Sequence, residues 1–179
     1  MSNDNTIINN FITEPMSDGV SGLIIDKNTI KGNTIVNAGR AGINLRSTPR
    51  FGTSDDNQVL DNTIISSIEE GISVGGKRNV IQGNTIDQSG ESGIVVISFA
   101  GTNFVGRSLT SEDVIIKNNS ITNSKLGGIL IGGNSFGNTP ASLNTVVIGN
   151  TLAGNGNEDN LLDFGSNTIE AGNIPTNLM

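Results

Sequence analysis

Cysteine, histidine, tryptophan and tyrosine are all absent from this sequence of 179 residues, and its six phenylalanines are the only aromatic residues. Without histidine or cysteine, the chain can form neither a Ser-His-Asp triad nor a cysteine nucleophile. It also lacks the usual ligands of zinc, haem and iron–sulfur clusters. We therefore expect no cofactor, and any bound metal would be a hard cation held by oxygen atoms, such as Ca²⁺.

Positive charge is scarce too, because 10 basic residues stand against 17 acidic ones and the net charge is −7. This balance argues against a nucleic-acid partner. No apolar run approaches the roughly 18 residues that a membrane span needs, so we expect no membrane insertion. No signal peptide is visible at the N-terminus, and the missing cysteines leave the redox compartment open. An extracellular or cell-surface location is favoured only if the chain is part of a longer secreted protein.

The composition is dominated by 26 Asn, 24 Gly and 24 Ile. So much isoleucine argues against disorder, and the excess of Asn and Gly suggests a repeat. A tripeptide of the form Asn-Thr-Ile does recur along the chain. It occurs, with small variations, at Asn5-Thr6-Ile7, Asn33-Thr34-Ile35, Asn62-Thr63-Ile64, Asn84-Thr85-Ile86, Asn119-Ser120-Ile121 and Asn150-Thr151-Leu152.

Further columns appear when the apolar residue of each tripeptide is taken as an anchor. Five residues before the anchor stands another apolar residue, and eight residues after it comes an Ile preceded by Gly. The Gly-Ile pairs are Gly42-Ile43, Gly71-Ile72, Gly93-Ile94 and Gly128-Ile129. With Ile7 as the first anchor, successive anchors are 28, 29, 22, 35 and 31 residues apart. The common unit is therefore about 22 residues long and carries insertions.

These units predict an all-β solenoid. Short runs of Ile and Val bounded by Gly, Asn and Ser are typical of strands, and a unit of this length must stack to bury its apolar face. We expect one domain, residues 1–179, with six to seven coils of three strands each. The apolar columns would lie inside, and the Asn column would form a hydrogen-bonded ladder at a corner, in left-handed backbone conformation. The Gly of each Gly-Ile pair would supply another tight corner.

The extra residues are expected to leave this core mostly at one edge. They fall at Arg46–Asp56, Ile97–Glu112 and Gly132–Leu143, each after a Gly-Ile strand. The first unit differs, with its extra residues around Phe11–Met16. The last unit, around residues 160–174, is degraded. No amphipathic capping helix is evident, so the chain is either a fragment of a longer solenoid or has its ends covered by a partner, and self-association through the ends is conceivable.

The Asn-Thr-Ile and Gly-Ile-x-Val elements, over roughly residues 5–174, resemble the right-handed parallel β-helix repeat family. That family is related in fold to pectate lyases, alginate epimerases and NosD-type carbohydrate-binding repeats. The resemblance implies a polysaccharide partner lying along one outer strand face between long turns. The epimerase Asp-Pro-His and polygalacturonase Gly-His-Gly signatures are missing from this sequence. Asp55-Asp56 imitates the paired aspartates of polygalacturonases, but it lies in an insertion and reads as a solvated turn.

Two carboxylates are the first candidates for catalysis. Glu69 and Glu91 both follow their anchors by five residues, so stacking places them on neighbouring coils, with Arg40 at the same position one coil earlier. Like charges this close raise one pKa or bind a cation, which suits general acid–base chemistry or Ca²⁺. The alternative is an exposed Arg–Glu–Glu ladder without function.

Basic residues supply a second candidate site. Lys77 and Arg78 close the one turn without an insertion, Arg46 stands one coil earlier, and Ser73 is an outward residue of the strand between them. Such cations can neutralise a uronate carboxylate and assist a lyase, so we expect this notch to bind an anionic glycan. The alternative is that Lys77, Arg78 and Arg46 are ordinary basic turn residues.

One weak metal motif remains. Asn155, Asn157 and Asp159 alternate as in oxygen-ligand loops, but the segment lacks the extra carboxylates and the closing Glu of true Ca²⁺ loops.

Three functions stay open. The chain is a non-catalytic carbohydrate-binding or structural module, a lyase, hydrolase or epimerase acting on an anionic glycan, or a module that assembles end to end or as a trimer. The lack of Trp and Tyr weakens both carbohydrate hypotheses, because sugar sites favour aromatic platforms. The insertions offer only Phe51, Phe99, Phe104 and Phe136.

Overall fold

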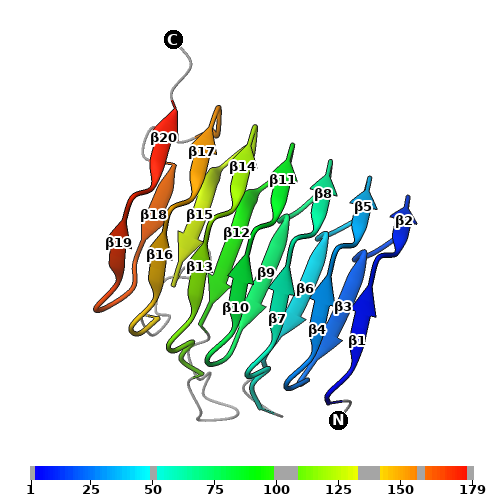
Figure 1. Ribbon diagram of the computed structural model, residues 1–179, viewed down its shortest axis with the longest axis horizontal. Helices are drawn as coiled ribbons and strands as arrows, with labels where there is room; N and C mark the ends of the chain where they lie inside the picture. Colours follow the sequence, from blue (N-terminus) through cyan, green and yellow to red (C-terminus); the bar gives the residue numbers. More distant parts are fainter. Residues whose placement is uncertain (1–2, 49–51, 99–108, 133–141, 157–159, 177–179) are drawn as a thin grey trace, which may run out of the picture.

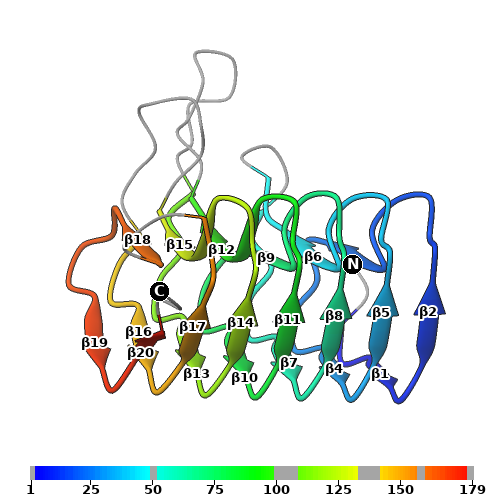
Figure 2. The same cartoon turned by 90° about the horizontal axis from the view of Figure 1, so that it is seen from above.

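The computed structural model describes residues 3–48, 52–98, 109–132, 142–156 and 160–176. Within these ranges every regular element is a β-strand, and no helix is long and apolar enough to cross a membrane. The strands follow one another along the long axis of the molecule, from the N-terminal end to the C-terminal end (Figure 1). Figure 2 shows the successive coils side by side, each with strands from three sheets. The expected parallel β-helix of six to seven coils is confirmed.

Three parallel sheets form the walls of the solenoid. Sheet A contains β1 (Thr6–Ile8), β4 (Thr29–Lys31), β7 (Gln58–Leu60), β10 (Val80–Gln82), β13 (Ile115–Lys117), β16 (Val146–Ile148) and β19 (Ile169–Ala171). Sheet B contains β2 (Phe11–Thr13), β5 (Thr34–Val36), β8 (Thr63–Ile65), β11 (Thr85–Asp87), β14 (Ser120–Thr122), β17 (Thr151–Ala153) and β20 (Ile174–Thr176). Sheet C contains β3 (Val20–Leu23), β6 (Ile43–Arg46), β9 (Ile72–Gly75), β12 (Ser92–Ile97), β15 (Gly127–Ile131) and β18 (Leu161–Asp163).

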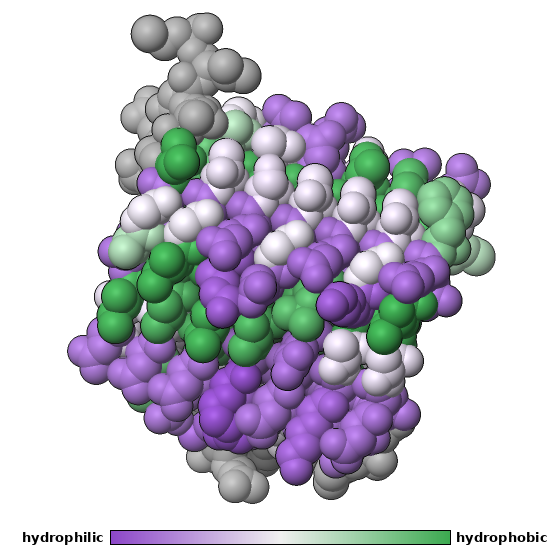
Figure 3. Space-filling view, viewed as in Figure 1, coloured by the Kyte–Doolittle hydropathy of each residue, from purple (hydrophilic) through white to green (hydrophobic). Residues whose placement is uncertain are grey.

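The predicted apolar columns line the interior. Both predicted ladders are completely buried, each member with 0% of its surface exposed: Ile43, Ile72, Ile94 and Ile129 in sheet C, and Ile35, Ile64, Ile86 and Ile121 in sheet B. The outer surface is mostly polar, and Figure 3 shows a hydrophobic band crossing one such face. Stacking thus buries what a single coil would leave exposed.

The glycines of the Gly-Ile pairs have a different role from the predicted one. None of them has positive φ. A Cβ atom on Gly71 would instead lie 2.5 Å from Ile86 Cγ2 and 2.6 Å from the carbonyl oxygen of Gly93. A Cβ on Gly42 would meet Ile64 in the same way, at 2.5 Å. These positions are glycine because the packed interior of the next coil leaves no room for a side chain.

The first unit is regular, which corrects the anchor taken from the sequence. Ile12, not Ile7, pairs with Ile35 in sheet B, and Ile7 pairs with Ile30 in sheet A. The first two anchors are therefore Ile12 and Ile35, and Val20 follows Ile12 by the usual step. The supposed extra residues at Phe11–Met16 are simply β2 and the corner after it. Asn5-Thr6-Ile7 imitates the anchor tripeptide because an Asn also precedes each of the first four strands of sheet A.

The predicted asparagine ladder is present at the corner before sheet B. Each Asn donates a hydrogen bond from its backbone N–H and another from Nδ2 to the amide oxygen of the Asn in the next coil. For Asn62 and Asn84 these distances are 2.9 and 3.0 Å. The ladder is longer than predicted and comprises Asn10, Asn33, Asn62, Asn84, Asn119, Asn150 and Asn173.

A second ladder at the corner before sheet A was not predicted. It repeats the same two hydrogen bonds through Asn5, Asn28, Asn57 and Asn79. It ends at Asn79 because the corresponding residue of the next coil, directly before β13, is Val114, which has no amide side chain to continue the ladder. A visible signal was available in the sequence, since each of these residues stands five positions before an Asn of the first ladder.

The ladder residues themselves are not in the left-handed conformation, which corrects a further expectation. Positive φ occurs at the residue just before each of them. Before the sheet B ladder these residues are Asn9, Gly32, Asp61, Gly83, Asn118, Gly149 and Gly172. Before the sheet A ladder they are Asp4, Lys27, Asp56 and Arg78, and Asp113, Asn144 and Asn167 have positive φ at the same corner of the later coils. The turn is thus made one residue earlier, which frees the ladder Asn to direct its amide into the corner.

The long insertions fall at one corner, as predicted. They separate β6 from β7, β12 from β13 and β15 from β16, so each lies between a strand of sheet C and the next strand of sheet A. Serines close two of them. Ser54 N–H donates to Ser47 Oγ over 2.9 Å, and Ser111 N–H donates to Ser98 Oγ over 3.0 Å. The four aromatic residues at positions 51, 99, 104 and 136 lie outside the described residues.

Candidate functional site

The outer face of sheet C carries a cluster of polar side chains over its first three strands. It consists of Asp18, Asn44, Arg46, Glu70 and Ser73, which we call the sheet C cluster. Asn44 and Ser73 are cross-strand partners on β6 and β9, and they alternate with the buried residues on either side. They therefore point outward, yet only 0% and 1% of their surfaces are exposed. Polar side chains this well covered on an outer face need hydrogen-bond partners.

Asn44 has such partners within the cluster. Its Nδ2 donates to Asp18 Oδ2 over 3.1 Å, and its Oδ1 accepts from Arg46 Nε over 3.0 Å. Asp18 also accepts from the backbone N–H of Ala41, at 3.2 Å. Each of these bonds fixes a rotamer, so the Arg46 guanidinium is held over the face with its terminal nitrogens still available as donors.

Ser73 is different. Its hydroxyl makes no hydrogen bond with any other described residue, although the side chain is almost completely buried. The register places it beside Asn44 on one side and Val95 on the other. A hydroxyl is both donor and acceptor, so Ser73 offers an unused polar contact at the base of the cluster.

Glu70 supplies the titratable group of the face. Burial raises the pKa of its carboxyl above the ordinary value, and the carboxylates of Glu91 and Glu69 add to this effect. Its own backbone N–H and the positive charge of Arg46 oppose it. A raised pKa means that the Glu70 carboxyl binds its proton more tightly than an ordinary glutamate does.

The predicted Arg40–Glu69–Glu91 column borders the cluster. Backbone hydrogen bonds stack the three residues on successive coils, from Glu91 N–H to Glu69 O and from Glu69 N–H to Arg40 O, both 3.2 Å long. Arg40 Nε also donates to Glu69 Oε1 over 3.1 Å, and this bond raises the pKa of Arg40. The stacking is as the sequence indicated. The carboxyl with the raised pKa, however, is the neighbouring Glu70.

Lys77 and Arg78 lie elsewhere, in the turn that leads from β9 towards sheet A, and both face carboxylates. Lys77 Nζ forms an ion pair with Glu112, and the Lys77 N–H donates to Asp55 Oδ1 over 2.9 Å. Arg78 binds Asp56 through two nitrogens, at 2.7 and 2.8 Å. This bidentate pair lowers the pKa of Asp56 and raises that of Arg78. The structure therefore places Arg46 and Ser73 on either side of Asn44 but gives Lys77 and Arg78 carboxylate partners in the turn after β9.

Of the three residues of the weak metal motif, the structure describes only Asn155. Asn155 takes the corner position that serines hold in earlier coils, and its Oδ1 accepts from the Ser124 N–H over 2.8 Å. Its Nδ2 donates to the Ile121 carbonyl oxygen and to Asn160 Oδ1. Asn157 and Asp159 lie outside the described residues. Among the residues that the structure describes, no group of three or more acidic side chains is placed to hold a metal ion.

Comparison with known proteins gives consistent results. Residues 1–109 match the family described as "Right handed beta helix region". A search among curated protein sequences finds no match. The periplasmic alginate epimerase AlgG superposes with a TM-score of 0.73 at 19% identity, covering 99% of this chain and 40% of that one.

Two further solved structures are similar. The A-module of the Azotobacter vinelandii mannuronan C-5 epimerase AlgE6 gives a TM-score of 0.65 at 15% identity, covering 100% of this chain and 60% of that one. A mannuronic acid specific family 6 polysaccharide lyase from human gut microbiota gives 0.54 at 16% identity, covering 97% and 52%. The chain therefore spans about half the length of such proteins, and at these identities the likeness establishes the fold.

Proposed function

Because this chain belongs to the right-handed β-helix family, and because its outer strand face carries a partly unsatisfied polar cluster, we propose that it is a non-catalytic carbohydrate-binding module. The ligand would lie along the outer face of sheet C, across the sheet C cluster. The observation that carries this proposal is the Ser73 hydroxyl, which points outward from sheet C and has no hydrogen-bond partner among the described residues.

The chemistry of the cluster suits sugar hydroxyls. Arg46 offers guanidinium donors, Ser73 offers both a donor and an acceptor, and Glu70 offers a carboxyl whose pKa is raised by burial. Such groups recognise neutral hydroxyls through paired hydrogen bonds, as small-molecule sites commonly do. The similar solved structures support the ligand class, since their names include two alginate-type epimerases and a polysaccharide lyase.

The same observations weigh against a strong preference for polyuronates. Lys77 and Arg78, the cations expected to meet an anionic sugar, are engaged by Glu112 and Asp56. Around the sheet C cluster, Arg46 and Arg40 stand among the carboxyl groups of Asp18, Glu69 and Glu70. A polymer with one carboxylate on each sugar would meet repulsion there, so a neutral glycan fits the described residues better.

Binding to a glycan array, followed by titration of the best ligand, tests the proposal. Ser73→Ala should weaken binding by roughly two- to tenfold, the value of one hydrogen bond, while Arg46→Gln should have a larger effect. Lys117→Gln is the matched control, because Lys117 ends β13 in sheet A. Equal binding by all three variants, or no binding to any glycan, would contradict the proposal.

An enzyme acting on a polysaccharide is the second candidate, and one observation favours it. The raised pKa of Glu70 is what a general acid requires. Incubation with a panel of polyuronates and neutral glycans, with measurement of released reducing ends and of unsaturated products, separates the two functions. Turnover that Glu70→Gln abolishes would establish an enzyme.

We also propose a secreted or surface location, in keeping with the periplasmic epimerase.

A further inference from the structure

The outer face of sheet B carries a straight row of hydroxyl groups. In five successive coils the first residue of the sheet B strand is Thr or Ser, and its side chain points outward because the next residue is buried. The register pairs each of them with the next: Thr34, Thr63, Thr85, Ser120 and Thr151, which we call the hydroxyl row. Figure 3 shows pale residues of intermediate hydropathy in a straight row along the upper part of the molecule, where sheet B lies. The row ends within the chain, since Phe11 and Ile174 hold this position in the flanking coils.

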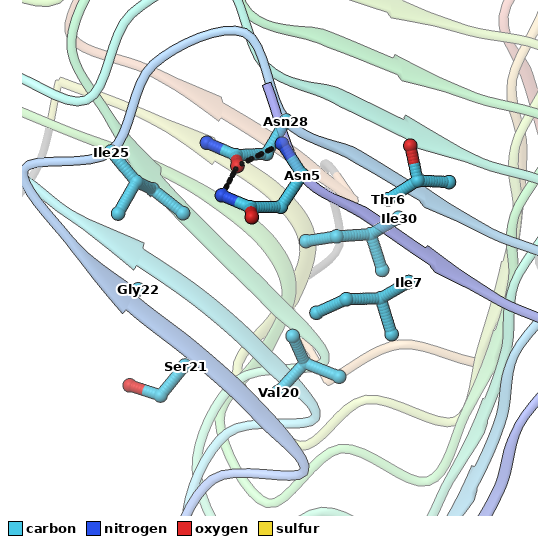
Figure 4. A pocket seen from close by; sticks show the side chains of 9 residues that line it. All are labelled: Asn5, Thr6, Ile7, Val20, Ser21, Gly22, Ile25, Asn28 and Ile30. Atoms are coloured by element: carbon cyan, nitrogen blue, oxygen red, sulfur yellow. Dashed lines mark hydrogen bonds between the residues drawn. The ribbon is translucent and has the colours of Figure 1, made fainter. Parts of the chain in front are cut away.

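The spacing of this row is fixed by the backbone and by the asparagine ladder. Each member directly follows an Asn of the sheet B ladder, and its backbone N–H donates to the carbonyl oxygen of the ladder Asn one coil earlier, over 2.8 or 2.9 Å in every case. Figure 4 shows the pair of bonds with which a ladder Asn holds the next coil, in this view from Asn5 to Asn28 of the sheet A ladder. The connection from sheet A to sheet B has the same length in every coil. The hydroxyl groups therefore repeat at the distance between neighbouring strands, about 4.8 Å.

The five hydroxyl groups are free of protein partners in the described part of the chain. No hydrogen bond joins any of them to another described residue. Thr122, at the other outward position of β14, is different, because its Oγ1 donates to Asp87 Oδ1 over 2.7 Å. Thr85 is exposed and the other four members are half-buried, so solvent reaches the row. Each hydroxyl can donate one hydrogen bond and accept others, and the branched Cβ of Thr restricts its χ1. The row thus offers fixed donors and acceptors to whatever lies against it.

The surroundings of the row are almost free of charge. Asp87 is the only charged residue in the described strands of sheet B, and Thr122 and Asn123 both donate to its carboxylate. Val36 and Ile65 occupy the other outward position beside the row. The protein as a whole has a net charge of −7, so this face differs from the rest. An ionic ligand would find no counter-charge here, whereas a neutral ligand that repeats with the strands meets no repulsion.

Hydrogen-bonded water has nearly the same repeat as the row. Two water oxygens that share a hydrogen-bonded neighbour lie about 4.5 Å apart, because each O–H···O distance is about 2.75 Å and the angle between the two bonds is tetrahedral. Water molecules bound to adjacent hydroxyl groups, about 4.8 Å apart, therefore take positions close to those of an ice lattice. The apolar side chains beside the row offer this water no competing hydrogen bond.

From these features we infer that the outer face of sheet B is an ice-binding surface. Each hydroxyl of the row anchors one water molecule, and the row holds these water molecules at a spacing that lets them join the lattice of an ice crystal. The stacked backbone positions the hydroxyl groups before the ice meets them, so little conformational entropy is lost on contact. This face is separate from the sheet C cluster, and neither proposal depends on the other.

Recrystallisation of ice in a frozen sucrose solution tests the inference. The full chain should keep the mean ice grain smaller than an unrelated acidic protein does at equal concentration. In a second measurement, ice is grown slowly from a dilute protein solution, and the chain should be enriched in the ice relative to the same unrelated protein. Thr85→Lys should raise the concentration needed for inhibition by about tenfold or more, because a long charged side chain holds the lattice away from the row.

Two further variants locate the surface. Gln58→Lys is the matched control, since Gln58 is likewise exposed but stands on sheet A. It adds the same charge and should leave both measurements unchanged. Thr85→Val keeps the branched shape and removes one hydroxyl, so its inhibition should lie between that of the parent and that of Thr85→Lys. Circular dichroism melts show whether each variant is folded, and Thr85→Val keeps the test valid if Thr85→Lys is not.

Several results would overturn the inference. They are grain growth equal to that with the unrelated protein, absence of enrichment in ice, and equal losses in Thr85→Lys and Gln58→Lys. Binding to microcrystalline cellulose or chitin that Thr85→Lys abolishes, without any effect on ice, would make a crystalline glycan the ligand of this face. Ser73→Ala should change neither measurement on ice, so failure of ice binding and failure of glycan binding on sheet C are distinguishable.

Discussion

The amide oxygen of Asn119 accepts two hydrogen bonds from Asn84, one from the backbone N–H over 2.9 Å and one from Nδ2 over 3.0 Å. The same amide nitrogen of Asn84 also lies 2.9 Å from the Val59 carbonyl oxygen. One side chain thus ties together three successive coils at a place where water has no access. Its removal would orphan the backbone N–H and Nδ2 of Asn62, which donate to Asn84 Oδ1 over 2.9 and 3.0 Å, and would take a donor from the Val59 carbonyl oxygen.

Replacing Asn84 by Ala should therefore lower the free energy of unfolding by about 1–3 kcal/mol, since the neighbouring amides would lose buried partners. Chemical denaturation followed by circular dichroism measures this. Gln58→Ala, at an exposed position on sheet A, is the control and should change stability little. If the Asn84 variant unfolds at the same denaturant concentration as the parent, the hydrogen bonds of the ladder do not add to the free energy of unfolding.

Gly71→Ala should destabilise by about 1–3 kcal/mol, because the new Cβ would overpack the interior. It would lie 2.5 Å from Ile86 Cγ2. Gly75→Ala is the matched comparison, at the last residue of the strand that follows Gly71, since its Cβ would meet its nearest atoms only at 3.3 Å. The melting temperature of Gly71→Ala should be well below that of Gly75→Ala, and the reverse order would contradict the steric explanation.

Glu70→Gln should stabilise the protein at neutral pH. The pKa of Glu70 is raised in the folded state, so its ionisation opposes folding. The stability tied to this group is complete below the ordinary pKa of 4.5 and is lost as pH rises through the folded value. The variant should consequently have a higher free energy of unfolding than the parent above the folded-state pKa of Glu70, and this difference should vanish below the ordinary pKa of 4.5. Unfolding measured across this range, with Gln82→Glu as a charge control on sheet A, provides the test.

Asp56→Asn should have the opposite pH dependence. Arg78 lowers the pKa of Asp56, so this pair stabilises above the ordinary value of 3.8, and the contribution disappears as pH falls through the lowered value. Because both side chains are partly exposed, the loss at neutral pH should be small and should shrink further in high salt. Asn also tolerates the positive φ of this residue, so the substitution isolates the charge.

Much of the fold was predictable because the interior imposes one residue type on each column. Ile43 and Ile72 could be aligned from spacing alone, since a misplaced charge there would cost several kcal/mol. The first and last coils were harder, because tripeptides at their ends imitate the anchor. Asn167-Thr168-Ile169 has the form of the anchor tripeptide, yet the register turns Ile169 outward and brings Glu170 into the interior column.

The candidate site was predictable only in part. Spacing placed Ser73 on an outer face and stacked Glu69 beside Glu91, because stacking copies repeat positions into space. It could not show that Arg78 finds Asp56 or that Arg46 finds Asn44, since those contacts depend on rotamers. It also could not show that burial singles out Glu70. Desolvation is a property of the assembled surface, which no repeat position encodes.

The serine closures have a consequence for how such a protein can change. Ser47 and Ser54 join by the same bond as Ser98 and Ser111, although the second pair encloses a longer stretch of chain. The coil below therefore experiences the same local geometry whatever lies between the two serines. The sequence and length of the insertion can therefore vary at this corner without disturbing the stacked coils. Binding specificity can change there while the β-helix keeps its structure.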